Sequence, residues 1–209
     1  MTAPALITLE GLDGCGKSTQ IVLLAEYLRQ RGESVVVTRE PGGTPLGERL
    51  RELVLTSTPS TSAELALMCA SRAESVAGVI RPALAAGNWV LCDRFHDATE
   101  AYQGGGRGCD REEIRALHRI LCGDLQPDLT LILDLDPALA LERAHKRSAA
   151  SRFEKAGEEF YRRVREVYGD IARREPRRCR LIPAEGTPEE VAQRIRAAVE
   201  GAPEGGNAV

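Results

Sequence analysis

The fold is decided by residues 5–31, which read ALITLEGLDGCGKSTQIVLLAEYLRQR. An apolar run, Ala5–Glu10, leads directly into a glycine-rich turn, and the turn leads into Lys17–Arg31, where apolar residues recur at helical spacing. Residues 11–18 match the pattern G-x-x-x-x-G-K-[ST] at every required position. This order of strand, phosphate loop and helix predicts a nucleotide-binding protein of the P-loop class.

The phosphate loop has a clear physical basis. Successive backbone N–H groups, freed from side-chain bulk by its glycines, can wrap an anion at the start of a helix. Lys17, one of only three lysines, offers a mobile positive charge to the outer phosphates, and Ser18 offers a hydroxyl to a magnesium ion. A chance glycine-rich turn is the alternative, but the flanking strand and helix argue against it. The residues expected to hold ATP are Gly11, Leu12, Asp13, Gly14, Cys15, Gly16, Lys17, Ser18 and Thr19.

Elsewhere, short apolar runs alternate with longer segments of helical period, which is typical of a parallel sheet flanked by helices. Four further strands are expected, at Ser34–Thr38, Trp89–Cys92, Leu129–Leu135 and Cys179–Pro183. Helices are expected at about Pro45–Leu55, Ser62–Ala86, Asp110–Cys122, Pro137–Lys146, Ala156–Arg174 and Pro188–Glu200. Asp136 before Pro137, and Thr187 before Pro188 with Glu190 at the third helical position, mark two helix starts. The sequence therefore predicts an α/β fold with a five-stranded parallel sheet.

Length and composition limit the remaining possibilities. The 209 residues suit one domain, expected over residues 1–200, with a flexible tail at 201–209. A net charge of -3 gives no global basic field, so binding to nucleic acid is not expected. The six cysteines form no CxxC pair and no zinc spacing with the three histidines. No leader and no run of about twenty apolar residues is present, so we expect a soluble, cytoplasmic protein without a membrane partner.

A phosphate loop alone does not define the reaction, because GTPases, ATPases, kinases and nucleotide-binding modules share it. The sequence has no NKxD element of the kind that reads guanine, and the chain is too short for large coupling domains. A small nucleotide or metabolite kinase is therefore the simplest prediction.

The phosphate loop also contains a carboxylate, Asp13. This residue would repel bound polyphosphate unless it points toward another ligand, for which a sugar hydroxyl is a natural candidate. The alternative is that Asp13 caps the turn through its own backbone. The local sequence leaves both possibilities open.

Two further strand ends carry residues suited to phosphate, since such folds bind ligands at the carboxyl ends of parallel strands. After the second strand comes TREPGGT, in which Arg39 could meet a phosphate with Glu40 orienting it; a surface ion pair is the alternative. After the third strand comes DRFHDATEAYQGGGRG, residues 93–108. There Asp93 is placed to assist magnesium, and Arg94 to clamp an acceptor phosphate.

Four features thus occur together: the loop GLDGCGKST, the segment TREPGGT, the segment DRF followed by AYQGGGRG, and Arg72. In these features the chain resembles the bacterial thymidylate kinases, which transfer the γ-phosphoryl of ATP to dTMP. The resemblance covers roughly Leu6–Tyr168, including PDLTLILD at 127–134 and RFEKAGEEFYRRVREVY at 152–168. It implies ATP and dTMP as substrates, Mg²⁺ as cofactor and a homodimer, to which the apolar surface of Ser62–Ala86 could contribute.

The resemblance also implies roles for individual residues of the acceptor site. Asp13 would receive the 3′-hydroxyl of dTMP, and Arg39 and Arg94 would hold its phosphate. Tyr102 matches the aromatic residue that crowds the 2′ position and favours deoxyribose. These residues come from three different segments, so their roles require that the fold bring the segments together.

For the base, the resemblance implies that Arg72 hydrogen-bonds the thymine ring, that Thr99 can reach the base, and that Gln103 extends the element of Tyr102. Met68 stands where the family usually has a phenylalanine that stacks on thymine, and Ala98 where it has a serine. A thioether can contact a ring but selects its shape less strictly. A kinase for another nucleoside or nucleoside monophosphate, tolerant of dUMP, is therefore the alternative within enzymes, and a regulatory module without turnover is the alternative outside them.

The segment Arg143–Arg152 resembles the mobile lid that closes on ATP, with the whole lid at about residues 143–154. In one bacterial type the phosphate loop lacks a catalytic arginine and the lid supplies it; here residues 12–15 are Leu, Asp, Gly and Cys. We therefore expect a lid arginine to share the catalytic role with Lys17 and Arg94. The candidates are Arg147 and Arg152, with Arg143 at the helical base of the lid as a third. Ser151 departs from the acidic residue that the family has before Arg152.

Overall fold

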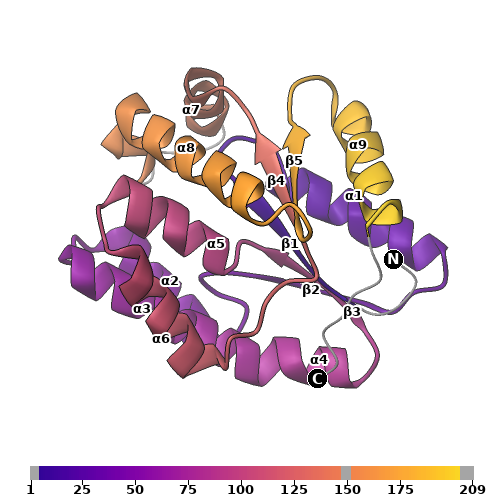
Figure 1. Cartoon of the computed structure of the whole chain (residues 1–209), viewed down its shortest axis with the longest axis horizontal. Helices are drawn as coiled ribbons and strands as arrows, with labels where there is room; N and C mark the ends of the chain where they lie inside the picture. The colour runs from indigo at the N-terminus through magenta and orange to yellow at the C-terminus, as the bar shows by residue number, and fades with distance from the viewer. Residues whose placement is uncertain (1–4, 147–151, 203–209) are drawn as a thin grey trace.

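The computed structural model describes residues 5–146 and 152–202, and in these it has a five-stranded parallel sheet at the centre (Figure 1). The strand order is β2-β3-β1-β4-β5. The strands are β1 Leu6–Gly11, β2 Val35–Arg39, β3 Trp89–Asp93, β4 Leu129–Asp134 and β5 Cys179–Pro183. The α/β class and all five predicted strands are confirmed. Residues 147–151 of the predicted lid and 203–209 of the predicted tail lie outside the described residues.

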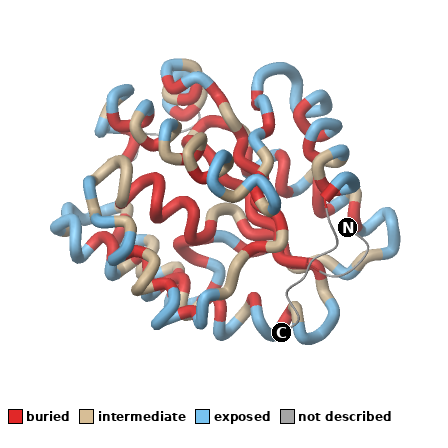
Figure 2. Tube along the Cα trace, in the orientation of Figure 1, coloured by how far each residue is buried: buried red, intermediate tan, exposed pale blue. Residues whose placement is uncertain are grey.

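The inner strands are apolar because helices cover both faces of the sheet, which leaves little of their surface in water. Along β1, Leu6 packs in a cluster with Val76 and Ile80, whereas Ile7 and Leu9 belong to the larger cluster on the other face. Every residue of β1 is buried, and the buried centre of the molecule is visible in Figure 2. The alternation fixes the register of the strands, so their carboxyl ends are aligned.

The helices follow the strands in the order expected for β-α-β crossovers. They are α1 Lys17–Gln30, α2 Pro45–Thr56, α3 Thr61–Ser75, α4 Arg81–Ala85, α5 His96–Thr99, α6 Arg111–Cys122, α7 Pro137–His145, α8 Glu158–Arg174 and α9 Pro188–Glu200. α1 and α9 lie against each other beside one part of the sheet, whereas α2, α3 and α6 form a group on the opposite side of the molecule (Figure 1). The predicted starts at Asp136 and Thr187 are confirmed, since both side chains cap their helices and Thr187 forms a capping box with Glu190.

Two predicted helices differ in detail from the structure. The predicted helix Ser62–Ala86 consists of α3, a π-helical turn η1 Val76–Ile80, and α4. The predicted helix Ala156–Arg174 is divided, because Gly157 has a left-handed φ of 86° between a short 3₁₀ helix and the start of α8 at Glu158. The segment after β3 was not predicted as helical, yet it forms α5 and the π-helical turn η2 Glu100–Gly106.

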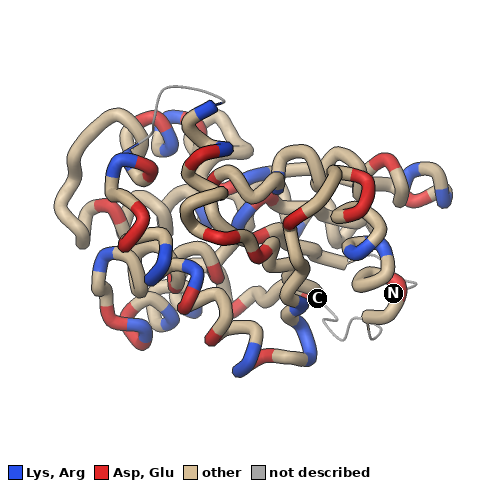
Figure 3. Tube along the Cα trace, turned by 90° about the horizontal axis from the view of Figure 1, so that it is seen from above, with Lys and Arg blue, Asp and Glu red and all other residues tan. Residues whose placement is uncertain are grey.

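In the tube of Figure 3, Lys and Arg residues are interspersed with Asp and Glu residues, and neither sign is confined to one side. This distribution agrees with the small net charge of -3. In the described part of the chain, every helix is too short or too polar to span a bilayer.

His96 of α5 and His118 of α6 are buried and stack on each other. The rings of His96 and His118 are 4.5 Å apart at an interplanar angle of 13°. Burial lowers the pKa of His96 to about 3 and that of His118 to about 4. Because His118 Nε2 lies 2.9 Å from the carbonyl oxygen of Leu125, it donates there, so the neutral ring carries its proton on Nε2.

We expect the contribution of His118 to the free energy of unfolding to fall as pH drops from about 6.5 to about 4, because the unfolded chain takes up a proton on His118 in this window and the folded chain does not. At pH 5 this residue should account for about 1–2 kcal/mol of lost stability. Urea titrations at pH 7 and at pH 5 give the change in the free energy of unfolding between the two pH values. Any decrease toward pH 5 should be smaller for His118→Gln than for the wild type. His145→Gln, at the exposed end of α7, is the control, and equal losses in the wild type and His118→Gln would contradict the prediction.

Candidate active site

The phosphate loop joins β1 to α1 in a backbone conformation that its glycines permit. Gly11, Gly14 and Gly16 all have left-handed φ values, of 127°, 88° and 103°. A Cβ atom on Gly14 would lie 2.0 Å from the carbonyl oxygen of Ala140, so the loop packs directly on the backbone of α7. The loop is thereby held at the carboxyl edge of the sheet, where α1 begins at Lys17.

Lys17 turns its ammonium group back over the loop. Its Nζ donates to the carbonyl oxygens of Leu12 at 2.8 Å and Gly11 at 3.2 Å. Ser18 is exposed beside it, and both residues line the cavity described below. A lysine and a hydroxyl at the start of α1 fit the phosphates of a nucleotide and a hard cation, respectively.

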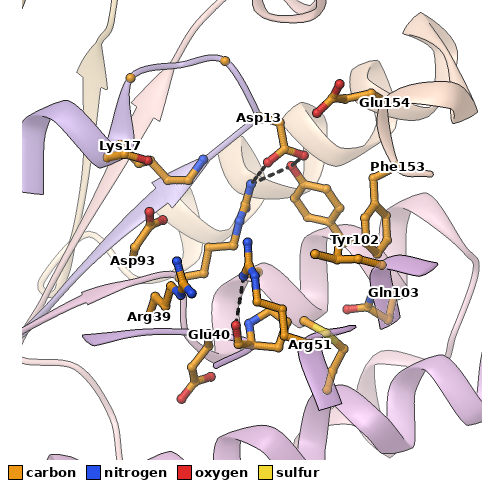
Figure 4. Close-up of a pocket in the computed structure, with 18 residues that line it drawn as sticks. Asp13, Lys17, Arg39, Glu40, Arg51, Asp93, Tyr102, Gln103, Phe153 and Glu154 are labelled. Atoms are coloured by element: carbon orange, nitrogen blue, oxygen red, sulfur yellow. Dashed lines mark hydrogen bonds and ion pairs between the residues drawn. The ribbon is translucent and has the colours of Figure 1, made fainter. Parts of the chain in front are cut away.

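Arg94 is the centre of a polar cluster that ties the phosphate loop to β3 and η2. Its Nη2 donates to Asp13 Oδ1 at 2.8 Å and to the Tyr102 hydroxyl at 3.0 Å, and its Nη1 donates to the Gly11 carbonyl at 2.9 Å. The backbone of Arg94 has a φ of 72°, which is uncommon outside glycine and turns the chain sharply at the end of β3. The Asp13 and Tyr102 contacts are drawn in Figure 4.

Asp13 is ionised in this cluster. Burial opposes its charge, but the positive charges of Arg94 and Lys17 and a hydrogen bond from Tyr161 outweigh burial and hold the pKa of Asp13 well below its usual value. The Tyr161 hydroxyl donates to Asp13 Oδ2 at 2.9 Å, and that of Tyr102 donates to the same oxygen at 3.2 Å. The carboxylate therefore bonds side chains from three other segments. It does not serve only as a cap of its own turn.

At the end of β2, Arg39 and Glu40 point to different partners. Arg39 pairs with Glu48 at 2.9 Å on the exposed start of α2, so the expectation that Glu40 orients Arg39 is wrong. Glu40 is buried and accepts from Arg72 Nε at 2.8 Å. The cause is the backbone alternation of β2, which sends adjacent side chains in opposite directions. Arg39 lies beside Asp93 in the strand register.

Arg72 is almost fully buried, with 1% of its surface exposed. Besides Glu40, its Nη2 donates to the Thr99 hydroxyl at 2.8 Å and to the Phe95 carbonyl at 3.1 Å. Burial raises the pKa of Glu40 to about 7, against the opposing positive charge of Arg72. The structure thus places Thr99 against Arg72, and neither residue lines the cavity.

A cavity of about 500 Å³ opens at the carboxyl edge of the sheet, between the phosphate loop and α3 (Figure 4). It brings together Lys17 and Asp93 near the loop and Tyr102, Phe153 and Gln103 toward the opposite wall. The predicted site residues that line it are Asp13, Gly14, Gly16, Lys17, Ser18, Arg39, Glu40, Met68, Asp93, Arg94, Tyr102 and Gln103. The predicted residues that do not line it include Leu12, Cys15, Thr19, Arg72, Thr99, Arg143 and Arg152.

Several residues that shape this site escaped the sequence analysis. Arg51 of α2 lines the cavity, with its Nη1 bonded to the Pro41 carbonyl at 2.9 Å. Glu10 of β1 is buried, and its carboxyl group accepts from the Phe95 amide at 2.7 Å and the Tyr168 hydroxyl at 2.8 Å. The sequence signal for Arg51 was its place on the helix that directly follows TREPGGT.

Of the predicted lid arginines, two lie in described residues. Arg143 reaches from α7 to the carbonyl of Ala184, at 3.5 Å. Arg152 forms a close ion pair with buried Glu64 and stacks over Phe153, with its guanidinium carbon 4.7 Å from the ring centroid. Arg147 lies outside the described residues.

Together, the fold and this site define a P-loop phosphotransferase, with a glycine-rich loop for a donor nucleotide and an arginine-lined cavity beside it for an acceptor. A family model described as thymidylate kinase matches residues 9–195. The chain therefore belongs to the thymidylate kinase family.

Curated relatives and a solved structure agree with this assignment. The chain is 53% identical over 184 residues to a thymidylate kinase of Pseudomonas syringae, which covers 87% of this chain and 88% of that protein. It is 54% identical over 195 residues to that of a Synechococcus species, covering 93% of both chains. The crystal structure of the Ehrlichia chaffeensis thymidylate kinase superposes with a TM-score of 0.80 at 36% identity, covering 94% of this chain and 99% of that one.

Proposed function

We propose that the phosphate loop and the adjoining cavity hold ATP and dTMP end to end for phosphoryl transfer. As a member of the thymidylate kinase family, the chain phosphorylates dTMP to dTDP using ATP. On the donor side, residues 11–19 wrap the phosphates of ATP with their backbone amides, and Lys17 neutralises the outer phosphates. The observation that carries the proposal is that Asp13, inside this loop, accepts a hydrogen bond from Arg94, and that both residues line the cavity.

On the acceptor side, we assign the phosphate of dTMP to Arg94 and Arg39, with Arg51 as a third cation. All three line the same cavity, and guanidinium groups suit phosphate because their forked donors bind two oxygens at once. Asp13 can accept a hydrogen bond from the 3′-hydroxyl of the sugar, since its carboxylate is ionised and held by Tyr161 and Arg94. Tyr102 would contact the sugar beside it.

The base of dTMP is assigned to the wall formed by Met68, Gln103 and Phe153, which all line the cavity. Arg72, one helical turn after Met68 on α3, is held by Glu40 and Thr99 and is assigned to the base as well. A buried arginine with fixed partners presents donors in one orientation, which suits a carbonyl oxygen of the pyrimidine. In this proposal Thr99 and Glu40 act through Arg72 rather than on the base.

Magnesium would be held by Ser18 and Asp93 together with the phosphates of ATP. The two side chains supply a hydroxyl and a carboxylate to the same cavity, and such oxygen donors fit Mg²⁺, which keeps much of its water and binds through substrate phosphates. When bound, the ion would neutralise charge on the transferred phosphoryl group. The described residues contain no cluster of three or more His, Cys, Asp or Glu side chains suited to a metal.

The catalytic role of the protein would lie in alignment and charge neutralisation, because phosphoryl transfer requires little covalent chemistry from the enzyme. Lys17 and Arg94 both line the cavity and both donate to the Gly11 carbonyl, so both would reach the phosphates beside the loop. We further assign Arg147 and Arg152 as the arginines that supply positive charge from the segment 143–154, with Arg143 at its base. Arg152 would have to exchange its ion pair with Glu64 for the phosphates of ATP.

The proposal is tested by measuring ADP release with dTMP, dUMP, UMP, dCMP, dGMP and thymidine as acceptors. We expect dTMP to give the highest kcat/KM. A higher value for dUMP would favour the broader kinase suggested by Met68 and Ala98. ATP binding without acceptor-dependent ADP release would instead indicate a module without turnover.

A cytoplasmic homodimer completes the proposal. The six cysteines are all free, which is typical of proteins in a reducing compartment. Large apolar side chains are exposed on α2 and α6, namely Leu46, Leu53, Ile120 and Leu121. Exposed apolar surface of this kind supports a contact between two copies. Sedimentation equilibrium of the wild type and of Ile120→Glu measures the association directly.

A further inference from the structure

Glu64 of α3 lies at the junction of the cavity wall and the segment that begins at Arg152. Only 1% of its surface is exposed. Its Oε1 accepts a hydrogen bond from Gln103 Nε2 at 2.7 Å. Its Oε2 faces Arg152 in a close ion pair and Arg107 Nε at 3.5 Å. Two arginines therefore match the charge of this buried carboxylate, as a buried charge requires.

The chemistry of Glu64 fixes the orientation of the Gln103 amide. An ionised carboxylate has lone pairs but no proton, so it can only accept. Gln103 must therefore turn its NH₂ group toward Glu64 and its carbonyl oxygen away. Within the described part of the chain that oxygen is buried and has no hydrogen-bond donor. Leaving a buried acceptor unsatisfied costs about 1–3 kcal/mol, which a donor on a bound molecule would recover.

Gln103 belongs to the wall of the acceptor cavity, beside Tyr102 and Phe153 (Figure 4). We propose that Glu64 is a specificity-determining positioning residue, which locks the Gln103 amide so that the cavity accepts a pyrimidine presenting an N–H and rejects one presenting a lone pair. Thymine and uracil carry a proton on N3, whereas N3 of cytosine is an acceptor. The inference rests on the proposed placement of the dTMP base against Gln103.

The test is Glu64→Gln, because an amide at residue 64 can either donate or accept and so releases the lock. Gln103 can then turn its NH₂ group toward a base. The ratio of kcat/KM for dTMP to that for dCMP should fall by about tenfold or more. The ratio for dTMP to dUMP should remain within about twofold, since both bases carry the N3 proton. Equal falls for all three acceptors would show a merely structural role and overturn the proposal.

Two further variants distinguish the effect of the hydrogen bond between Glu64 and Gln103 from effects on packing and on folding. Arg107→Gln removes a charge beside Glu64 but keeps the contact of Glu64 with Gln103, so the dTMP to dCMP ratio should stay within about twofold. A fall as large as that of Glu64→Gln would overturn the proposal. If Glu64→Gln does not fold, Gln103→Leu tests the same oxygen, and an unchanged dTMP to dCMP ratio in that variant overturns the proposal. A wild type inactive on dTMP would instead refute the proposed function.

Discussion

Replacement of Arg94 by alanine is expected to lower kcat/KM for dTMP by about 10³-fold. One guanidinium group holds the Gly11 carbonyl, Asp13 and Tyr102, and it lines the cavity where the acceptor phosphate is proposed to bind. Removing a single preorganised donor of this kind costs about 10²–10³ in rate, and the loss of alignment between the loop and the cavity adds to it. Steady-state kinetics with dTMP as the varied substrate measure the effect.

Two comparisons make the result interpretable. Arg94→Lys keeps the charge but loses the fork, so it should recover only part of the activity. Arg173→Ala removes an exposed arginine that pairs with Asp170 on α8, and its kcat/KM should stay within about twofold of the wild type. If folded Arg94→Ala retains more than about a tenth of the wild-type kcat/KM, Arg94 is not part of the catalytic machinery.

Much of the site follows from sequence because parallel strands deliver their carboxyl ends to one edge of the sheet. Asp93 and Arg94 at the end of β3, and Arg39 at the end of β2, could be placed near the phosphate loop from strand assignments alone. The partner of Glu40 could not be placed. Arg72 lies 32 residues away on α3, and only the tertiary fold brings the two side chains together.

The segment after β3 shows why local patterns can mislead. Three consecutive glycines, residues 104–106, indicate a loop by composition, yet the chain is helical there. A Cβ atom on Gly105 would lie 2.5 Å from Val167, and one on Gly106 would lie 2.4 Å from the Phe160 ring. These two glycines therefore permit the close approach of η2 to α8. That approach is a tertiary contact, which no window of sequence contains.

A glycine in the phosphate loop gives the second large effect. Gly14→Ala is expected to destabilise the fold by about 2–5 kcal/mol and to weaken ATP binding at least about 100-fold. The left-handed backbone at this residue costs about 1–2 kcal/mol for any other side chain. The rest comes from the new Cβ atom, which would lie 2.0 Å from the carbonyl oxygen of Ala140. Backbone atoms cannot rotate away, so the loop or α7 must move.

Gly32→Ala is the matched control, because Gly32 has a φ of 87° against 88° for Gly14. Among the described residues, no heavy atom beyond its chain neighbours lies within 4 Å of the site of its Cβ. Both variants bear the same backbone strain, and only Gly14→Ala adds the collision. Urea unfolding should show a loss of about 1–2 kcal/mol for Gly32→Ala with unchanged ATP affinity by calorimetry. Equal destabilisation in the two variants would mean that the contact with α7 does not hold the loop. A larger loss for Gly14→Ala, together with lost ATP affinity, would establish α7 as the support on which the phosphate loop is built.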